Sequence, residues 1–196
     1  MLRIIGGSLK KRKIESVEGL STRPTADRVR ESIFNILFDR PRGSHVLDLF
    51  AGTGAMGIEA LSRGASFALF IDNDASALRT LKKNIQALSL SCKACVIAWD
   101  IRRNLRCLNH LSGHFDLVFM DPPYHSDLIL PTLDLLWKGG LLKSDATIVI
   151  EHGADEILPS NLPGYRKTDE RRYGKTGVTL FEIIAAIPRE EDLDEV

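Results

Sequence analysis

The 196-residue chain has few cysteines and no net charge, and it lacks long apolar runs. Of its three cysteines, Cys92 and Cys95 form a C-x-x-C pair and Cys107 stands apart. Such a set makes a poor zinc site. We therefore expect no metal, and we interpret the cysteines as small residues that fill the core of a protein in a reducing compartment.

No apolar stretch approaches the roughly 20 residues that a membrane span requires. The first residues, Met1 to Gly7, lack the long apolar region of a signal peptide. Hydrophobic residues make up 44% of the chain and charged residues 27%, which is ordinary for a soluble globular domain. We expect a cytoplasmic, monomeric protein without a membrane partner, built on one main domain.

The formal net charge is zero, but the charges are unevenly distributed. Residues 1–42 contain ten Lys and Arg against five Asp and Glu, whereas residues 189–196 are strongly acidic. A basic arm on a neutral protein indicates a polyanion bound at one end of the molecule. We divide the chain into a basic hairpin and helix (1–42), a core domain (43–188) and a solvated acidic tail (189–196).

Strand and helix patterns alternate through the core. This alternation predicts a parallel sheet with helices on both faces. The expected strands lie near 45–49, 67–71, 94–98, 115–120 and 145–151, and the expected helices near 54–63, 74–88, 100–110 and 126–137.

The two ends of the core depart from this alternation. Before it, residues 3–5 and 11–15 predict a short basic hairpin, and a helix is expected to start near Thr25 as its N-cap. After it, residues 165–173 and 177–187 flank a glycine-containing turn and predict an antiparallel hairpin.

A glycine-rich segment, Gly52-Thr53-Gly54-Ala55-Met56-Gly57, lies between a predicted strand and a predicted helix. It has the G-x-G-x-x-G pattern in the context that nucleotide binding requires, because glycines let the backbone turn tightly and approach a ligand closely. Asp72 ends the next apolar run, where a carboxylate can bind a ribose diol. NAD binding is the obvious alternative for this fingerprint taken alone.

The tetrapeptide Asp121-Pro122-Pro123-Tyr124 follows another apolar run and points to methyl transfer onto an amino nitrogen of a nucleobase. The lone pair of such an amine is delocalised into the ring, so catalysis needs acceptors that hold its N–H groups and aim the lone pair at the donor. The Asp121 carboxylate and the Pro122 carbonyl can be those acceptors. Pro123 helps to stiffen the loop, and Tyr124 offers a ring for stacking. The alternative is a strand end followed by a rigid turn.

Two features favour S-adenosylmethionine over NAD as the ligand of the glycine segment. Asp48 precedes Gly52 inside the strand, where it can reach the amino-acid end of the donor, and no dehydrogenase-like His or Lys arrangement is evident. Trp99 and Asp100 end the third strand, where a ring or an acid can meet adenine, although core packing is an equal alternative for Trp99. The candidate donor-binding residues are Asp48, Phe50, Ala51, Gly52, Thr53, Gly54, Asp72, Asn73, Trp99 and Asp100.

These motifs resemble those of the bacterial RsmD family, which are small-subunit ribosomal RNA guanine-N2 methyltransferases. The resemblance covers about residues 3–187, and its most specific part is the run Arg23-Pro24-Thr25-Ala26-Asp27-Arg28-Val29-Arg30-Glu31. The core motifs at 48–54 and 121–124 occur in the same order as in the family. One departure lies at Lys10-Lys11, where the family often has a glycine before the residue that matches Arg12.

The resemblance implies a Rossmann-like class I methyltransferase fold, with a seven-stranded, mostly parallel sheet that ends in an antiparallel hairpin. It also implies S-adenosylmethionine as the cofactor and a guanine in 16S ribosomal RNA, or in the small ribosomal subunit, as the substrate. Asp121 and Pro122 would hold the guanine amino group, with Pro123 beside them and Tyr124 stacked on the base. The residues expected to contact RNA phosphates are Lys10, Lys11, Arg12, Lys13, Arg23, Arg28 and Arg30.

Three alternatives to these assignments stay open. Arg28 and Arg30 could belong to a solvated helix face. The enzyme could instead methylate adenine N6 or cytosine N4 of another RNA or of DNA, although no segment remains for a DNA target-recognition domain. The chain could also be a non-catalytic RNA-binding protein, which the intact Asp48 and Asp121 argue against.

Overall fold

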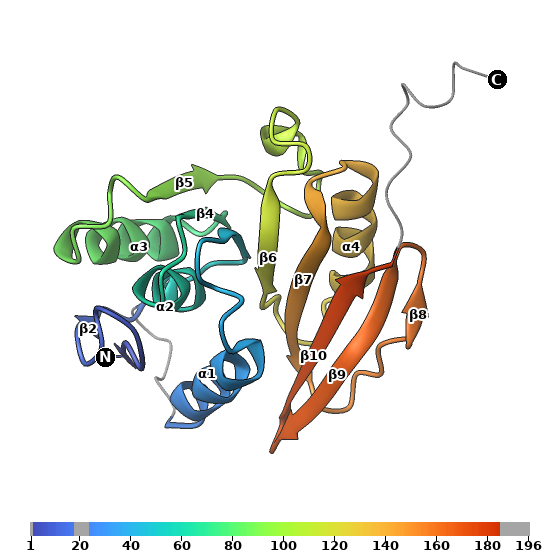
Figure 1. Cartoon of the computed structure of the whole chain (residues 1–196), viewed down its shortest axis with the longest axis horizontal. Helices are drawn as coiled ribbons and strands as arrows, with labels where there is room; N and C mark the ends of the chain where they lie inside the picture. The colour runs from blue at the N-terminus through green and yellow to red at the C-terminus, as the bar shows by residue number, and fades with distance from the viewer. Residues whose placement is uncertain (1, 18–23, 185–196) are drawn as a thin grey trace.

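The computed structural model describes residues 2–17 and 24–184 and builds them around one eight-stranded sheet (Figure 1). The first five strands in spatial order are parallel, and the last three pair antiparallel. The spatial order is β5 (Ala94–Ala98), β4 (Phe67–Asp72), β3 (His45–Leu49), β6 (Phe115–Met120), β7 (Leu142–Gly153), β10 (Thr176–Ile183), β9 (Tyr165–Tyr173) and β8 (Asn161–Leu162).

This arrangement confirms the mostly parallel sheet that ends in an antiparallel hairpin, with one strand more than the seven expected. The additional strand, β8, has two residues and pairs with the start of β9. A two-residue strand shows no alternation in the sequence, so its pattern could not be detected. Arg23 and the acidic tail lie outside the described residues.

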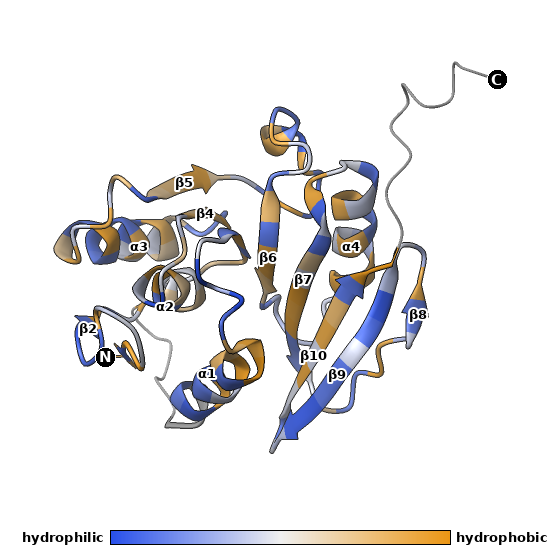
Figure 2. Cartoon of the chain, in the orientation of Figure 1, coloured by the Kyte–Doolittle hydropathy of each residue, from blue (hydrophilic) through white to orange (hydrophobic). Residues whose placement is uncertain are grey.

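Two groups of helices cover the sheet. On one face pack α1 (Pro24–Leu37), α2 (Ala55–Ser62) and α3 (Ala75–Ala87), and on the other packs α4 (Ile129–Lys138). Successive strand residues face opposite sides, so Val46 joins the core under α1–α3 and Leu47 joins the core under α4. Figure 2 shows β6, β7 and β10 as largely apolar, whereas β9 near the sheet edge is hydrophilic. Within the described residues, no helix is both long and apolar enough to span a bilayer.

The helix predicted over 100–110 is wrong. The segment forms turns and one short 3-10 helix, η1 (Arg106–Leu108). Its polar side chains bind nearby backbone: the Asp100 carboxylate accepts from the Arg102 N–H, and the Asn104 side chain accepts from the Arg106 N–H. Such local bonds compete with helical hydrogen bonds and favour turns.

The N-terminal hairpin is shorter than predicted and is docked on the sheet-covering helices. It pairs β1 (Leu2–Arg3) with β2 (Lys13–Ile14). The buried Glu59 side chain of α2 accepts hydrogen bonds from the backbone N–H groups of Ile5 and Gly6, both at 2.8 Å. The helix that follows begins at Pro24, so Thr25 lies inside it and is not its N-cap.

The order of the strands creates a topological switch point. From β3 the chain moves outward through β4 to β5, and it then returns to the other side of β3 as β6. Ligands of open parallel sheets bind in the crevice outside the carboxyl ends of the strands at such a point. The glycine segment follows β3 and the Asp121–Tyr124 tetrapeptide follows β6, so both motifs lie at this crevice.

Candidate functional site

The glycine segment forms a tight turn that only small residues allow. Gly54 has a φ of 79°, and a Cβ added there would lie 2.3 Å from Leu81 Cδ1. Gly52 has a φ of 54°, and the nearest atom to a Cβ built on it is the Phe50 carbonyl oxygen at 4.0 Å. Gly54 is therefore required for packing, while the open space beside Gly52 lets a ligand approach the backbone.

Asp72 connects the end of β4 to this turn. Its Oδ2 accepts a hydrogen bond from the Gly52 N–H at 2.7 Å, and its Oδ1 accepts one from the Asp74 N–H at 2.8 Å. A carboxylate offers about four lone-pair positions, so two remain for a ligand's hydroxyl groups. This is the position and the acceptor chemistry that a ribose diol requires.

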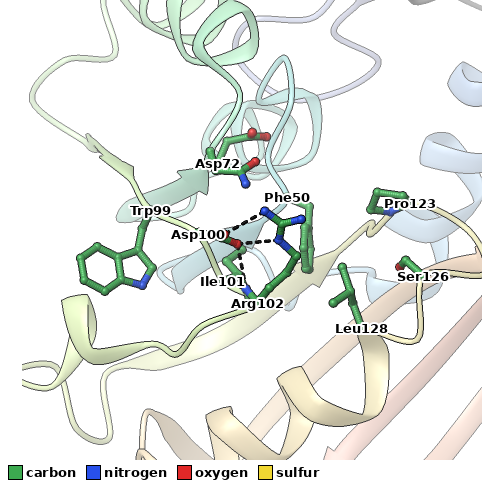
Figure 3. A pocket seen from close by; sticks show the side chains of 10 residues that line it. Phe50, Asp72, Trp99, Asp100, Ile101, Arg102, Pro123, Ser126 and Leu128 are labelled. Carbon is green, nitrogen blue, oxygen red and sulfur yellow. Dashed lines mark hydrogen bonds and ion pairs between the residues drawn. The ribbon is translucent and has the colours of Figure 1, made fainter.

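A cavity of about 270 Å³ opens beside the turn (Figure 3). This volume is close to the lower end of the range for small-molecule sites, about 300–1,000 Å³. The cavity brings together five of the predicted donor residues and four that sequence reasoning missed, Ile101, Arg102, Ser126 and Leu128. The five predicted donor residues are Phe50, Asp72, Asn73, Trp99 and Asp100, and Pro123 also lines the cavity.

The other predicted donor residues lie beside the cavity but do not line it. They are Asp48 in β3 and the loop residues Ala51, Gly52, Thr53 and Gly54.

Asp100 is held at the cavity by Arg102. The guanidinium donates to both carboxylate oxygens at 2.8 Å, as Figure 3 shows. These hydrogen bonds lower the pKa of Asp100, so the carboxylate stays ionised. The neighbouring Trp99 is also fixed, because its indole N–H donates to the Asn104 carbonyl oxygen at 2.8 Å.

Asp48 is buried under the glycine turn. Its Oδ2 accepts a hydrogen bond from the Gly57 N–H at 2.9 Å. The pKa of Asp48 is raised to about 8, mainly by burial and to a smaller extent by the negative charge of Asp72. A cationic ligand nearby would favour the ionised form, so the site is suited to a positively charged donor.

A second cluster joins acidic residues from three neighbouring strands. Strand alternation places Asp48 and Glu151 on the face covered by α1–α3. Asp121 follows Phe119 by two residues, so it is expected on the same face. Asp121 is exposed to solvent on one side but crowded by protein on the others. This partial desolvation and the negative charges of Glu151 and Asp48 raise its pKa well above the usual range.

Tyr124 connects this cluster to the final hairpin. Its hydroxyl donates to Glu151 Oε1 at 3.0 Å and lies 2.9 Å from Thr176 Oγ1, while the whole residue is 39% exposed. Burial raises the pKa of Glu151, and the Tyr124 hydrogen bond partly offsets this. Glu151 and Thr176 were missed by sequence reasoning. The available signal was a single acid at the end of the apolar run 146–150.

The predicted RNA-binding residues fall into two groups. Lys10, Lys11, Arg12, Lys13 and Arg28 are exposed. Arg30 is only 4% exposed, and its guanidinium donates to the Arg3 carbonyl oxygen and to Asp27, at 2.7 and 3.0 Å. Arg30 therefore holds the hairpin against α1, and we leave it out of the RNA surface proposed below.

Asn84 of α3 links the hairpin segment to the glycine turn, and sequence reasoning missed it. The residue is 2% exposed. Its side-chain amide donates to the carbonyl oxygens of Glu15 and Thr53, at 3.1 and 3.0 Å, and it accepts from the Glu15 N–H at 2.7 Å. Across residues 2–17 and 24–184, no group of His, Cys, Asp and Glu has the arrangement of a metal site.

Comparisons with known proteins agree with this geometry. The family model described as Conserved hypothetical protein 95 matches residues 2–182. Ribosomal RNA small subunit methyltransferase D of Haemophilus influenzae is 37% identical over 162 residues, which cover 82% of this chain and 84% of the relative. YlbH of Bacillus subtilis, provisionally named an rRNA methyltransferase, is 41% identical over 184 residues, which cover 92% and 98% of the two chains.

Solved structures share the fold. An Escherichia coli structure titled provisionally as the methyltransferase yhhF has a TM-score of 0.83 and 35% identity, and the match covers 94% of this chain and 98% of that one. A more distant structure, SMU.776, was solved as a complex with SAH. It has a TM-score of 0.65 and 16% identity, and the match covers 85% of this chain and 52% of that one, so this likeness concerns the fold alone.

Proposed function

The chain belongs to the Conserved hypothetical protein 95 family, that of the RsmD-type ribosomal RNA methyltransferases, and from this premise we propose its reaction. The protein transfers the methyl group of S-adenosylmethionine to the exocyclic N2 of a guanine in 16S ribosomal RNA. The observation that carries this proposal is the position of the loop Asp121–Tyr124. Pro123 lines the cavity beside the glycine turn, while Tyr124 of the same loop binds Glu151 in the acidic cluster.

The chemistry of the cavity fits the donor. S-adenosylmethionine carries a positively charged sulfonium whose methyl group is electrophilic. Asp72 has free lone pairs for the ribose hydroxyls, and the ionised Asp100 lines the same cavity as the rings of Phe50 and Trp99, which would receive adenine. The raised pKa of Asp48 suits a site where a bound cation completes the charge balance.

The acceptors for the amino group belong to the same loop as Pro123, which lines this cavity. The Asp121 carboxylate and the Pro122 carbonyl hold the N–H groups of the amine, so that its lone pair faces the methyl group. As the N–C bond forms and the S–C bond breaks, the nitrogen gains positive charge and loses a proton. Asp121 accepts this proton, and its raised pKa suits a general base. The Tyr124 ring, held by its hydroxyl, stacks on the base.

The basic hairpin supplies the surface for the RNA backbone. Lys10, Lys11, Arg12 and Lys13 are exposed on a segment that is fixed to α2 through Glu59. Exposed cations on a rigid support are suited to phosphates, which position a substrate without reading its sequence. The guanine amine is shielded inside a helix, so the target base is unpaired or flipped out when it enters the site.

The test is to incubate the purified protein with labelled S-adenosylmethionine and small ribosomal subunits from cells that lack the modification. The RNA is then digested and the labelled nucleoside identified. We expect N2-methylguanosine. Labelled N6-methyladenosine or N4-methylcytidine would assign the protein to the alternative amino group, and a bound donor without any labelled nucleoside would contradict the proposal.

A further inference from the structure

Glu151 lies beside Asp121 at the carboxyl ends of two paired strands. Met120 of β6 and Ile150 of β7 are partners in the parallel ladder, so the residues that follow them are neighbours. Because side chains alternate along a strand, both acids face the side of the sheet covered by α1. The negative charge of Glu151 raises the pKa of Asp121, which agrees with this proximity.

The Glu151 side chain is fixed in one orientation but is not saturated with hydrogen bonds. Tyr124 donates to Oε1, and the Thr176 hydroxyl lies within hydrogen-bond distance of the Tyr124 oxygen. A carboxylate has about four lone-pair positions. Within the described residues, Tyr124 is the side-chain hydrogen-bond partner found for Glu151, so a ligand can use the remaining positions.

Two adjacent carboxylates offer hydrogen-bond acceptors and no donors. The nucleobases differ in how well their edges match such a pair. On the Watson–Crick edge of guanine the N2 amino group stands next to the N1–H, so the two neighbouring groups are both donors. In adenine the amino group stands next to N1, and in cytosine next to N3, and each of these ring nitrogens is an acceptor. A pair of carboxylates therefore accepts both hydrogen bonds that the guanine edge donates. With adenine or cytosine, one carboxylate oxygen instead faces the lone pair of a ring nitrogen.

We propose that Glu151 accepts a hydrogen bond from N1–H of the target guanine while Asp121 holds the N2 amino group. Glu151 is then a specificity-determining residue, and Tyr124 and Thr176 position it. This inference rests on the proposed function and deepens it, because it supplies a physical reason for guanine over adenine and cytosine. No covalent step is added to the reaction.

The raised pKa of both acids is consistent with this assignment. Burial raises the pKa of both acids, and the negative charge of Glu151 raises that of Asp121 as well, so it is costly to ionise the two together. Two N–H donors from the base would stabilise the ionised pair by charge-assisted hydrogen bonds. An adenine or cytosine edge offers a donor to one acid and a lone pair to the other, so it leaves part of this cost in place.

The experiment compares guanine with 2-aminopurine at the methylated nucleotide, once the assay above has mapped it. The RNA carrying the analogue is ligated from a synthetic fragment and reassembled into small subunits. 2-Aminopurine keeps the amino group but has a lone pair at N1. We expect kcat/KM of the wild-type protein to be about 100-fold or more lower for the analogue, because sites built around a substrate N–H reject ligands that lack it.

Glu151→Gln tests which residue reads N1. Its amide can turn an N–H toward the N1 lone pair, so we expect the preference for guanine to fall to about 10-fold or less. 2-Aminopurine also lacks the O6 atom, but this loss affects both proteins, so the change in preference isolates the N1 contact. Glu170→Gln is the matched control, because Glu170 is exposed on β9 and pairs with Lys167, and its preference should equal that of the wild type.

The outcomes separate this inference from the proposed function. Equal methylation of guanine and 2-aminopurine by the wild-type protein would overturn the role of N1–H, and this comparison stands even if the variant does not fold. An unchanged preference in a folded Glu151→Gln variant would overturn the role of Glu151. In both cases N2-methylguanosine is still formed from the natural substrate. Its absence with the wild-type protein would instead overturn the proposed function, and this inference with it.

Discussion

The side chain of Asn84 donates a hydrogen bond to the carbonyl oxygen of Thr53 at 3.0 Å, although 31 positions separate the two residues in the sequence. The same amide also binds both backbone groups of Glu15. One buried side chain thus joins the glycine turn to the segment that follows the basic hairpin. The proposed donor site and the proposed RNA surface are therefore connected through the Asn84 amide.

Asn84→Ala should reduce both stability and donor affinity. The substitution removes three part-buried hydrogen bonds between Asn84 and the backbone of Glu15 and Thr53, and each group that is left unsatisfied away from water costs about 1–3 kcal/mol. We expect a loss of about 2–4 kcal/mol in the free energy of unfolding, measured by urea denaturation, and weaker binding of S-adenosylmethionine by calorimetry. Lys82→Ala, at an exposed position of the same helix, is the control. Wild-type stability in Asn84→Ala would show that the amide is dispensable.

Asp121→Ala should abolish methylation and leave the affinity for S-adenosylmethionine within a few-fold of wild type. The carboxylate lies outside the residues that line the donor cavity, and it is assigned to hold the amine. Calorimetry gives the affinity, and transfer of label to small subunits gives the activity. Asp134→Ala on α4 is a suitable control, because that carboxylate pairs with Lys138 on the helix surface. Near-normal turnover of Asp121→Ala would remove Asp121 from the mechanism.

Asp48 should make the free protein less stable as pH rises. Burial raises its folded-state pKa from 3.8 to about 8, so between these values the folded state keeps a proton that the unfolded state has lost. By linkage, this group's contribution to the free energy of unfolding falls by at most about 1.4 kcal/mol per pH unit in that window. Asp48→Asn removes the titration but keeps an oxygen for the Gly57 N–H. The difference in stability between wild type and variant should therefore change steadily from pH 4 to pH 8 in denaturation experiments. A constant difference would contradict the raised pKa.

The parts of the site that could be predicted are contiguous in sequence. Residues 48–54 and 121–124 carry their motifs locally, at strand ends that the apolar runs locate. Glu151, Thr176 and Asn84 could not be found this way, because their hydrogen bonds span 27 to 69 positions and depend on how the strands and helices pack.

Arg30 was predicted to contact RNA, and the structure shows it buried instead. The basic character of residues 1–42 predicts a phosphate contact for Arg30. However, the docking of the hairpin on α1 and α2 buries the Arg30 guanidinium against the Arg3 carbonyl. Whether an arginine is exposed is decided by tertiary contacts, which a local pattern does not contain.

Substitution of Lys10, Lys11 and Lys13 by Gln should weaken RNA binding and flatten its salt dependence. Each phosphate contact contributes a slope of roughly 0.7–0.9 in log affinity against log salt, so three lost contacts would lower the slope by about 2 to 3. Arg12 is kept, because its guanidinium donates to the Ala87 carbonyl oxygen at the end of α3 and its loss would also affect packing.

The measurement is RNA binding at several salt concentrations, and the matched control neutralises three exposed cations elsewhere on the molecule, Lys93, Arg106 and Lys138. If the hairpin binds the RNA backbone, only the hairpin variant changes the slope of log RNA affinity against log salt. Its affinity for S-adenosylmethionine should stay that of the wild type. Equal slopes in the two variants would mean that the hairpin is not the phosphate-binding surface, and the exposed Arg28 of α1 would then be the next residue to test.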